Sequence, residues 1–195
     1  ASDCSFYYCR DVNPMVFTGY ALQQQSYPSK AVSAFEYKGS EIDCPKEDFF
    51  DFVFTSPPYW KVEKYHGANQ SYLLYKKFDC WMECFLFPMV KNAWLSLQHG
   101  GKMILNISDC YANHTYNKIC GPLIEYATTE LPQCYLSGVM GYEITSRNRN
   151  GVNAEPLLVF SRGKSTPLDE ILPESKQTEM EYQTVTPEDQ EAKGS

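Results

Sequence analysis

The sequence has no long hydrophobic run. It contains no stretch of about 18 consecutive apolar residues, the minimum that marks a helix able to cross a bilayer, so we expect no transmembrane segment and no membrane partner. No basic amino-terminal stretch leads into an apolar segment, so we expect no signal peptide either. The chain opens on Ala1 without a methionine, and we therefore expect a fragment or a processed form.

The sequence is also poor in metal-ligand patterns. Its eight cysteines form no C-x-x-C pair, and only three histidines accompany them. Structural zinc sites combine closely spaced Cys and His ligands, so the sequence predicts no metal site. Most of the cysteines stand among apolar residues, as Cys80 and Cys84 do in a helical pattern, and we expect reduced, buried thiols. Such thiols favour an intracellular location, in the cytoplasm or the nucleus.

Positive charge is scarce, because 17 basic residues face 24 acidic ones and the formal net charge is −7. Residues 164–195 carry three lysines against eight acidic residues, together with three prolines and few apolar residues. This composition predicts a disordered acidic tail after a domain at 1–163. The domain itself is nearly neutral, which does not favour a free-standing nucleic-acid binder, although a local basic patch would suffice.

Strand-like and helical patterns alternate through residues 1–163. Short apolar or alternating runs bounded by turn residues predict strands, and apolar residues at helical spacing predict helices. The predicted strands cover 6–9, 31–37, 51–54, 103–107, 139–145 and 156–160, and the predicted helices cover 17–25, 72–97 and 116–129. This alternation predicts an α/β domain with a mainly parallel sheet. Pro88 should kink or split the second helix, and His99-Gly100-Gly101 should end it.

The most informative segment is Asp51–Trp60, with the sequence D-F-V-F-T-S-P-P-Y-W. A buried strand over 51–54 leads into Ser56-Pro57-Pro58, where neither a strand nor a helix can continue. In open α/β sheets, ligands bind at the carboxyl ends of the strands, so this segment is a candidate site. The alternative is a proline-rich turn with surface aromatic residues.

This segment resembles the catalytic motif of the S-adenosylmethionine-dependent methyltransferases that modify exocyclic amines, at N6 of adenine or N4 of cytosine. In that family an Asp, Asn or Ser precedes Pro-Pro and an aromatic residue. The similarity continues to a subgroup with T-S-P-P-Y-F-x-x-E-x-Y, then Q-S, a helical Y…W, an L-x-x-G-G segment and a final E-P strand. The matching residues here are Thr55–Tyr65, Gln70-Ser71, Tyr75, Trp81, Leu97–Asp109 and Glu155–Phe160. The resemblance covers roughly residues 35–162 and implies a Rossmann-like methyltransferase sheet with helices on both faces.

The family chemistry implies a role for each residue of the motif. An exocyclic amine is a poor nucleophile, because its lone pair is delocalised into the ring. The Ser56 hydroxyl and the Pro57 carbonyl would accept the amino hydrogens and make the nitrogen more tetrahedral, while Pro57 and Pro58 fix the backbone. Tyr59 would offer a face on which the extruded base stacks. Trp60 would extend that face, or it belongs to the core instead.

The resemblance also implies a site for the cofactor S-adenosylmethionine. Asp11 and Asn13 match the acidic loop after the second strand, whose carboxylate accepts hydrogen bonds from ribose hydroxyls. An Asx turn is the alternative for these two residues. Ser40 and Glu41 match the segment that borders the adenine, and Thr55 precedes the catalytic serine. We expect these five residues to bind the cofactor.

Basic and aromatic residues near the motif are candidates for substrate binding. They are Trp60, Lys61, Tyr65, Arg147 and Arg149. The cationic members could hold phosphates at the mouth of the site, whereas a solvated loop is the alternative for the two arginines. Asn106 and Asp109 end a strand at the same edge and could touch cofactor or base, although Asp109 suits a helix N-cap or a turn equally well.

One family feature is missing. Most members carry a glycine-rich loop, F-x-G-x-G or G-W-G, after the first and central strand, where the backbone approaches the cofactor. The chain has no such loop, and its nearest candidate, Phe17-Thr18-Gly19, follows the Asp11 segment and holds a single glycine. If Asp11 is assigned correctly, another segment or subunit supplies the central strand and its loop. The alternative is that 6–9 is itself that strand and the cofactor site is degenerate.

The sequence therefore predicts methyl transfer to the exocyclic amine of a nucleic-acid base, with DNA favoured over RNA. Serine before Pro-Pro favours N4 of cytosine by family habit, and N6 of adenine stays open. The alternative is a catalytically silent methyltransferase-like subunit that binds nucleic acid or a partner protein. The missing loop and the acidic charge favour that alternative, whereas the intact Ser56–Tyr59 set argues against it. A protein amide is a further candidate substrate.

Overall fold

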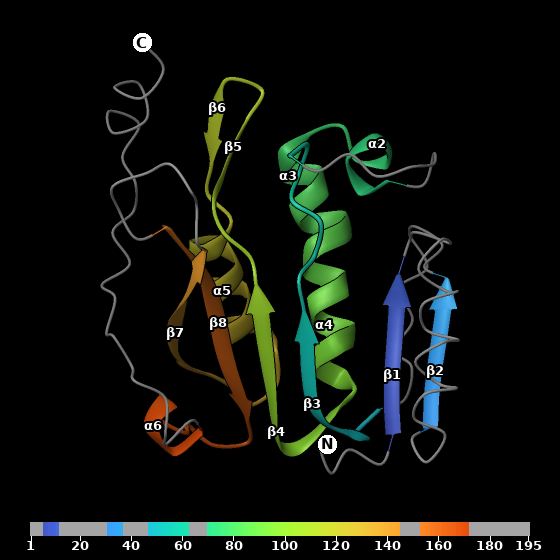
Figure 1. The fold of residues 1–195 in the computed structure, drawn as a ribbon, viewed down its shortest axis with the longest axis vertical. Helices are drawn as coiled ribbons and strands as arrows, with labels where there is room; N and C mark the ends of the chain where they lie inside the picture. Colours follow the sequence, from blue (N-terminus) through green and yellow to red (C-terminus); the bar gives the residue numbers. More distant parts are fainter. Residues whose placement is uncertain (1–5, 12–30, 37–46, 63–69, 145–152, 172–195) are drawn as a thin grey trace.

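The computed structural model describes residues 6–11, 31–36, 47–62, 70–144 and 153–171, and the structural statements below concern these residues. They form a four-stranded sheet, a two-stranded sheet, a small hairpin, and helices that follow and cover the larger sheet (Figure 1). None of the described helices is long and apolar enough to cross a membrane. The helix predicted over 17–25 lies outside the described residues.

The larger sheet has the strand order β3-β4-β8-β7. Its strands are β3 (Phe50–Thr55), β4 (Leu97–Asn106), β8 (Asn153–Arg162) and β7 (Cys134–Ile144). β3 pairs parallel to β4, whereas β8 runs antiparallel to both of its neighbours. The sheet is therefore mixed, with only β8 reversed. The predicted α/β class is confirmed, and the sheet that was predicted to be mainly parallel is partly parallel.

A second sheet consists of β1 (Phe6–Asp11) and β2 (Ala31–Glu36), which pair parallel along their full length. Both strands were predicted from the sequence pattern. No described strand joins this pair to the larger sheet. In Figure 1 the pair lies beyond β3, on the side away from β4, and its arrows point the same way as the arrow of β3. Among the described strands, the larger sheet therefore ends at β3.

β3 is an unusual edge strand because some of its exposed side chains are large and apolar. Phe52 and Phe54 are two residues apart, so both point to the same face of the strand, and they are 53% and 57% exposed. Sheets with parallel strands are normally covered on both faces, and natural edge strands normally avoid such side chains. This part of β3 is thus incompletely covered by the described residues.

Four short helical segments connect β3 to β4. They are α2 (Ser71–Leu74), α3 (Phe78–Trp81), a π-helical turn η1 (Met82–Leu86) and α4 (Phe87–Leu95). The single helix predicted over 72–97 is therefore divided, first between α2 and α3 and then by the π-helical turn. Pro88 is the second residue of α4 and follows the π-helical turn closely, so the helix is irregular next to the proline, which has no N–H to donate.

The predicted helix end at His99-Gly100-Gly101 is wrong. α4 already ends at Leu95, and the three residues lie within β4. The register passes from Phe50 opposite Leu97 to Phe52 opposite Lys102, so β4 accommodates extra residues at this point. Gly100 adopts a φ of 89° there, a conformation that glycine adopts without steric cost.

A hairpin and a helix follow β4. The hairpin of β5 (Cys110–Ala112) and β6 (Thr115–Asn117) was not predicted, although Asn113 and His114 at its tip both have a φ of 59°, which Asn tolerates well. α5 (Cys120–Glu130) confirms the helix predicted near 116–129, with a later start.

The hydrophobic core lies on one face of the larger sheet, where α4, η1 and α5 contribute to it together with α3. Side chains of β4 and β8 alternate, so Met103, Leu105, Leu158 and Phe160 point into this core. The largest fully buried side chains are Trp81, Trp94, Phe160, Leu86, Leu97 and Met103. Burial of this apolar surface is the main term that stabilises the domain.

Contacts with the larger sheet continue past Gly163, the predicted end of the domain, and that boundary stays a prediction. The Ser161 hydroxyl donates to the Lys164 carbonyl at 2.7 Å, and the Lys102 ammonium donates to the Thr166 hydroxyl at 3.3 Å. Ser161 and Lys102 alternate with buried core residues, so this segment and α6 (Leu168–Ile171) lie on the opposite face of the sheet. Residues 172–195 lie outside the described residues, and a disordered acidic tail there stays a prediction.

Gly163 is a described glycine that should not tolerate a side chain. It adopts a φ of 94°, and a Cβ atom there would overlap the His99 imidazole. We expect Gly163→Ala to lower the free energy of unfolding by about 1–3 kcal/mol. In α5, where a Cβ at Gly121 meets nothing within 4 Å, Gly121→Ala should raise it by up to about 1 kcal/mol. Urea unfolding of both variants tests this, and equal effects would contradict the account.

Candidate active site at the carboxyl end of β3

The motif begins where the β3–β4 ladder ends. The last paired residues are Thr55 and Leu105, and Ser56 follows with an exposed side chain. The ladder stops here because Pro57 and Pro58 have no N–H to donate. Pro57 is buried and Pro58 half-buried, so the turn is packed against the protein while the Ser56 hydroxyl faces solvent. This is the carboxyl edge that the sequence predicted as a ligand site.

The hydroxyl end of Tyr59 is buried. Its side chain is half-buried and packs against the hydrophobic core. The hydroxyl is buried and makes no well-formed hydrogen bond among the described residues, although Ser108 lies near enough to influence it. Burial raises the pKa of Tyr59, the nearby Ser108 partly offsets this, and the Glu155 carboxylate raises the pKa further. Tyr59 therefore remains a neutral phenol at physiological pH.

Trp60 occupies the core position that the sequence offered as the alternative, and its predicted substrate contact stays a prediction. Trp60 is only 5% exposed, and its indole N–H donates to the Tyr75 carbonyl at 3.2 Å. Its ring meets the Phe78 ring edge-on, with centroids 5.4 Å apart. These contacts anchor the motif to Tyr75, at the end of α2, and to Phe78 of α3.

Lys61 lies just outside this anchor. Its backbone has a φ of 57°, and its ammonium stands 4.4 Å from the centroid of the Trp60 ring. This is a cation–π contact. The predicted role of Lys61 in holding phosphate remains a prediction.

Gln70-Ser71 and Trp81 belong to the same packed region as Trp60. Gln70 and Ser71 are buried, and the Trp81 indole donates to the Ser71 hydroxyl at 3.0 Å. Trp81 also stacks on Phe78, with centroids 6.2 Å apart. The residues that extend the motif in the sequence thus form a packed support, in the order Trp81, Phe78, Trp60.

Asp109 accepts hydrogen bonds from neighbouring parts of the protein. Its carboxylate accepts the backbone N–H groups of Ile119 and Cys120 at 2.7 and 2.8 Å, and the Tyr116 hydroxyl at 3.0 Å. These N–H groups lie at the start of α5, where backbone N–H groups have no partners within the helix. Burial, with the nearby Asp109, raises the pKa of Tyr116. Of the two alternatives for Asp109, the structure supports capping, from ten residues upstream of Ile119.

Two residues that lie near Tyr59 were not identified as site residues from the sequence. Ser108 follows β4 and Glu155 lies in β8, and both influence Tyr59. β8 runs antiparallel to β4, so its amino-terminal end meets the carboxyl end of β4. The E-P strand had been recognised from the sequence, but the position of Glu155 near the motif depends on that reversal.

The remaining predicted site residues are only partly described. Asp11 is the last residue of β1, and Thr55 is the last residue of β3. The others, namely Asn13, Ser40, Glu41, Tyr65, Arg147 and Arg149, lie outside the described residues. Their roles stay predictions.

The described cysteines follow the prediction of buried thiols only in part. Cys110, Cys120 and Cys134 are buried free thiols, but Cys80 is half-buried and Cys84 exposed. Burial raises the pKa of Cys110 to about 11 and that of Cys134 to about 12, so neither is a reactive thiolate at neutral pH. No group of three or more side chains that could hold a metal ion occurs in the described ranges.

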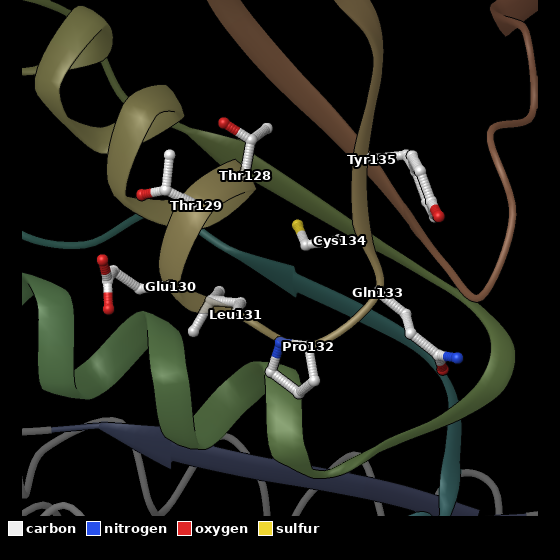
Figure 2. A pocket seen from close by; sticks show the side chains of 8 residues that line it. All are labelled: Thr128, Thr129, Glu130, Leu131, Pro132, Gln133, Cys134 and Tyr135. Carbon is white, nitrogen blue, oxygen red and sulfur yellow. The ribbon is translucent and has the colours of Figure 1, made fainter.

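A depression on the described surface lies away from the candidate site. It is shallow and lined by the continuous segment 128–135, which joins α5 to β7 (Figure 2). Cys134 contributes a thiol to it, and none of the predicted site residues does. A hollow made by one loop with an inert thiol offers no converging catalytic groups, and the motif at the end of β3 is the better candidate.

Comparison with known proteins gives structural likenesses only. No protein-family profile matches the chain, and no curated protein sequence does. A structure described as SAM-dependent methyltransferases from Methanosarcina mazei matches with a TM-score of 0.49 and 8% identity, covering 83% of this chain and 94% of that one. The PvuII DNA methyltransferase, described as cytosine-N4-specific, matches with a TM-score of 0.43 and 15% identity over 62% of this chain and 45% of that one.

A third likeness is to an rRNA methylase from Streptococcus thermophilus, with a TM-score of 0.43 and 9% identity over 83% of this chain and 88% of that one. At such identities the likenesses concern the course of the backbone. The chemistry of this chain therefore has to be argued from its own site residues.

Proposed function

We propose that this chain is an S-adenosylmethionine-dependent methyltransferase that methylates the exocyclic amine of a nucleic-acid base. DNA is the favoured substrate, at N4 of cytosine or N6 of adenine. The observation that carries the proposal is the end of β3, where an exposed Ser56 hydroxyl precedes a packed Pro57-Pro58 turn and a ring, Tyr59, whose hydroxyl end is buried. The three structures described above are methyltransferases by description, and the proposal does not rest on them.

The geometry suits the activation of an amine. The Ser56 hydroxyl and the Pro57 carbonyl accept the two amino hydrogens, which frees the nitrogen lone pair. Since the turn is fixed by its prolines and by the Trp60 anchor, these acceptors need little ordering during the reaction. The Tyr59 ring supports the flat face of the base. No residue of the set needs a metal ion for this role.

The cofactor, when bound, supplies an electrophilic methyl group on a sulfonium centre. The residues proposed to hold it are Asp11, Asn13, Ser40, Glu41 and Thr55. Of the described ones, Asp11 and Thr55 both end strands, and the arrows of β1 and β3 point the same way in Figure 1. Strand ends at one edge of an α/β sheet are where such ligands bind, so these two positions fit the cofactor.

We further propose that another segment or subunit supplies the central strand and its glycine-rich loop. β3 has one neighbour among the described strands, and β1 and β2 form a sheet of their own. A two-stranded parallel sheet is rarely stable by itself. One further parallel strand between β3 and β1 would join both sheets and pair the open backbone edge of β3, next to the face that carries the exposed Phe52 and Phe54.

Calorimetric titration of S-adenosylmethionine into the chain alone tests the cofactor arrangement. If another segment completes the site, the folded chain should show no saturable binding. Saturable binding that Asp11→Ala weakens would contradict the need for that segment while supporting the cofactor site. A chain that still binds no cofactor after the segment has been added would favour the catalytically silent subunit instead.

A further inference from the structure

Asn106 lies beside the catalytic serine at the end of the neighbouring strand. Phe54 pairs with Ile104 and Thr55 with Leu105, so the next residues along the two strands are Ser56 and Asn106. Side chains alternate along a strand, which places Ser56 and Asn106 on the same face of the sheet. Asn106 also pairs with Leu157 of β8, so its backbone position is fixed from the other side.

The Asn106 side chain carries a buried acceptor without a partner. Its Oδ1 atom is buried and accepts no hydrogen bond from any described residue. A buried polar atom left unpaired costs about 1–3 kcal/mol, and native proteins keep few of them. In the register of the two strands this acceptor follows the last pair, as Ser56 does, so we infer that a donor from this position reaches it when the site is occupied.

The Ser56 hydroxyl needs an acceptor of this kind. A hydroxyl has one hydrogen and two lone pairs, and the hydrogen can rotate to either side. To accept a hydrogen from the target amine, Ser56 must direct its own hydrogen elsewhere. Solvent can receive it while the site is open, but a bound base excludes that solvent.

We propose that Asn106 is a positioning residue whose Oδ1 accepts the hydroxyl hydrogen of Ser56. This directs a Ser56 lone pair at the amine, and it rests on the function proposed above. The other three unpaired buried atoms among the described residues do not fit this role: the Tyr59 hydroxyl lies near Ser108, the Ser137 hydroxyl belongs to β7, and Arg162 Nε at the end of β8 is a donor that cannot accept a hydrogen. Asn106 is therefore the described residue placed to orient Ser56.

The proposal predicts a loss of turnover that depends on the acceptor atom. Asn106→Leu should lower kcat by about tenfold to a hundredfold, less than the loss of a direct contact to the reacting group, with KM for DNA little changed. Asn106→Asp keeps an acceptor oxygen in place and should stay within about fivefold of the native kcat. Radiolabelled methyl transfer, with the completing segment present, measures both. The matched control is Ser137→Ala, which removes another unpaired buried hydroxyl and should not change kcat.

A double-mutant cycle with Ser56→Ala separates positioning from a merely structural role. If Asn106 acts through Ser56, Asn106→Leu should have no further effect once Ser56 is alanine. Effects that multiply would overturn the proposal, as would unchanged turnover in Asn106→Leu. The proposed function fails in a distinguishable way, because the native protein would then transfer no methyl group to an exocyclic amine.

Discussion

Ser56→Ala is expected to lower the rate of methyl transfer by about 10²- to 10³-fold, the usual loss when one preorganised hydrogen-bonding group is removed from a reacting centre. Ser56 is exposed at the end of β3, and no other described side chain is proposed to accept a hydrogen of the amine. The variant should bind DNA and cofactor as before, since it loses only the hydroxyl that acts on the amine. Single-turnover transfer of a labelled methyl group measures the loss.

The matched control is Ser165→Ala, which removes an exposed hydroxyl from the segment before α6. Neither variant should shift the urea midpoint, because neither hydroxyl is buried. Equal turnover of Ser56→Ala and Ser165→Ala would remove Ser56 from the mechanism. A lower urea midpoint for Ser56→Ala would instead show that the serine stabilises the turn.

Trp81→Ala is expected to lower the free energy of unfolding by about 3–5 kcal/mol, more than any other substitution predicted here. Trp81 is fully buried, donates to the Ser71 hydroxyl, and contacts the rings of Phe78 and Phe85. Its removal leaves a cavity and an unsatisfied hydroxyl. Because Phe78 packs on Trp60, the cavity should also loosen the turn that holds the motif. Denaturant unfolding measures the stability, and the methyl-transfer rate reports the turn.

Phe54→Ala provides the matched control for Trp81→Ala. It also removes a large aromatic side chain, but one that is 57% exposed in this structure. For the chain alone its effect on the free energy of unfolding should stay below about 1 kcal/mol. A Trp81→Ala effect as small as that of Phe54→Ala would contradict the packed support described for the motif.

The end of β3 could be predicted because its cause is local. A run of apolar residues forms a strand wherever a sheet accepts it, and Pro57-Pro58 ends the ladder in any surroundings. The exposure of Ser56 and the position of the motif at the sheet edge follow from these two facts. β1 and β2 were also predicted from local patterns, β1 from a short apolar run that ends in a turn and β2 from alternating residues.

Features that depend on distant partners could not be predicted in the same way. Trp60 is equally suited to a stacking face and to a core, and the Tyr75 carbonyl and the Phe78 ring decide in favour of the core. Asp109 caps α5 across a hairpin that gave no clear pattern. The position of Glu155 depends on the reversed direction of β8, which only the sheet pairing reveals.

The central claim is that the motif transfers methyl groups to an exocyclic amine. Its most direct test is mass spectrometry of nucleosides from DNA that has been incubated with S-adenosylmethionine, the chain and its completing segment. The account predicts N4-methylcytosine or N6-methyladenine with the native protein, and a strong reduction of that product with Ser56→Ala. Methylation at a ring carbon, or equal product from the Ser56→Ala protein, would contradict it.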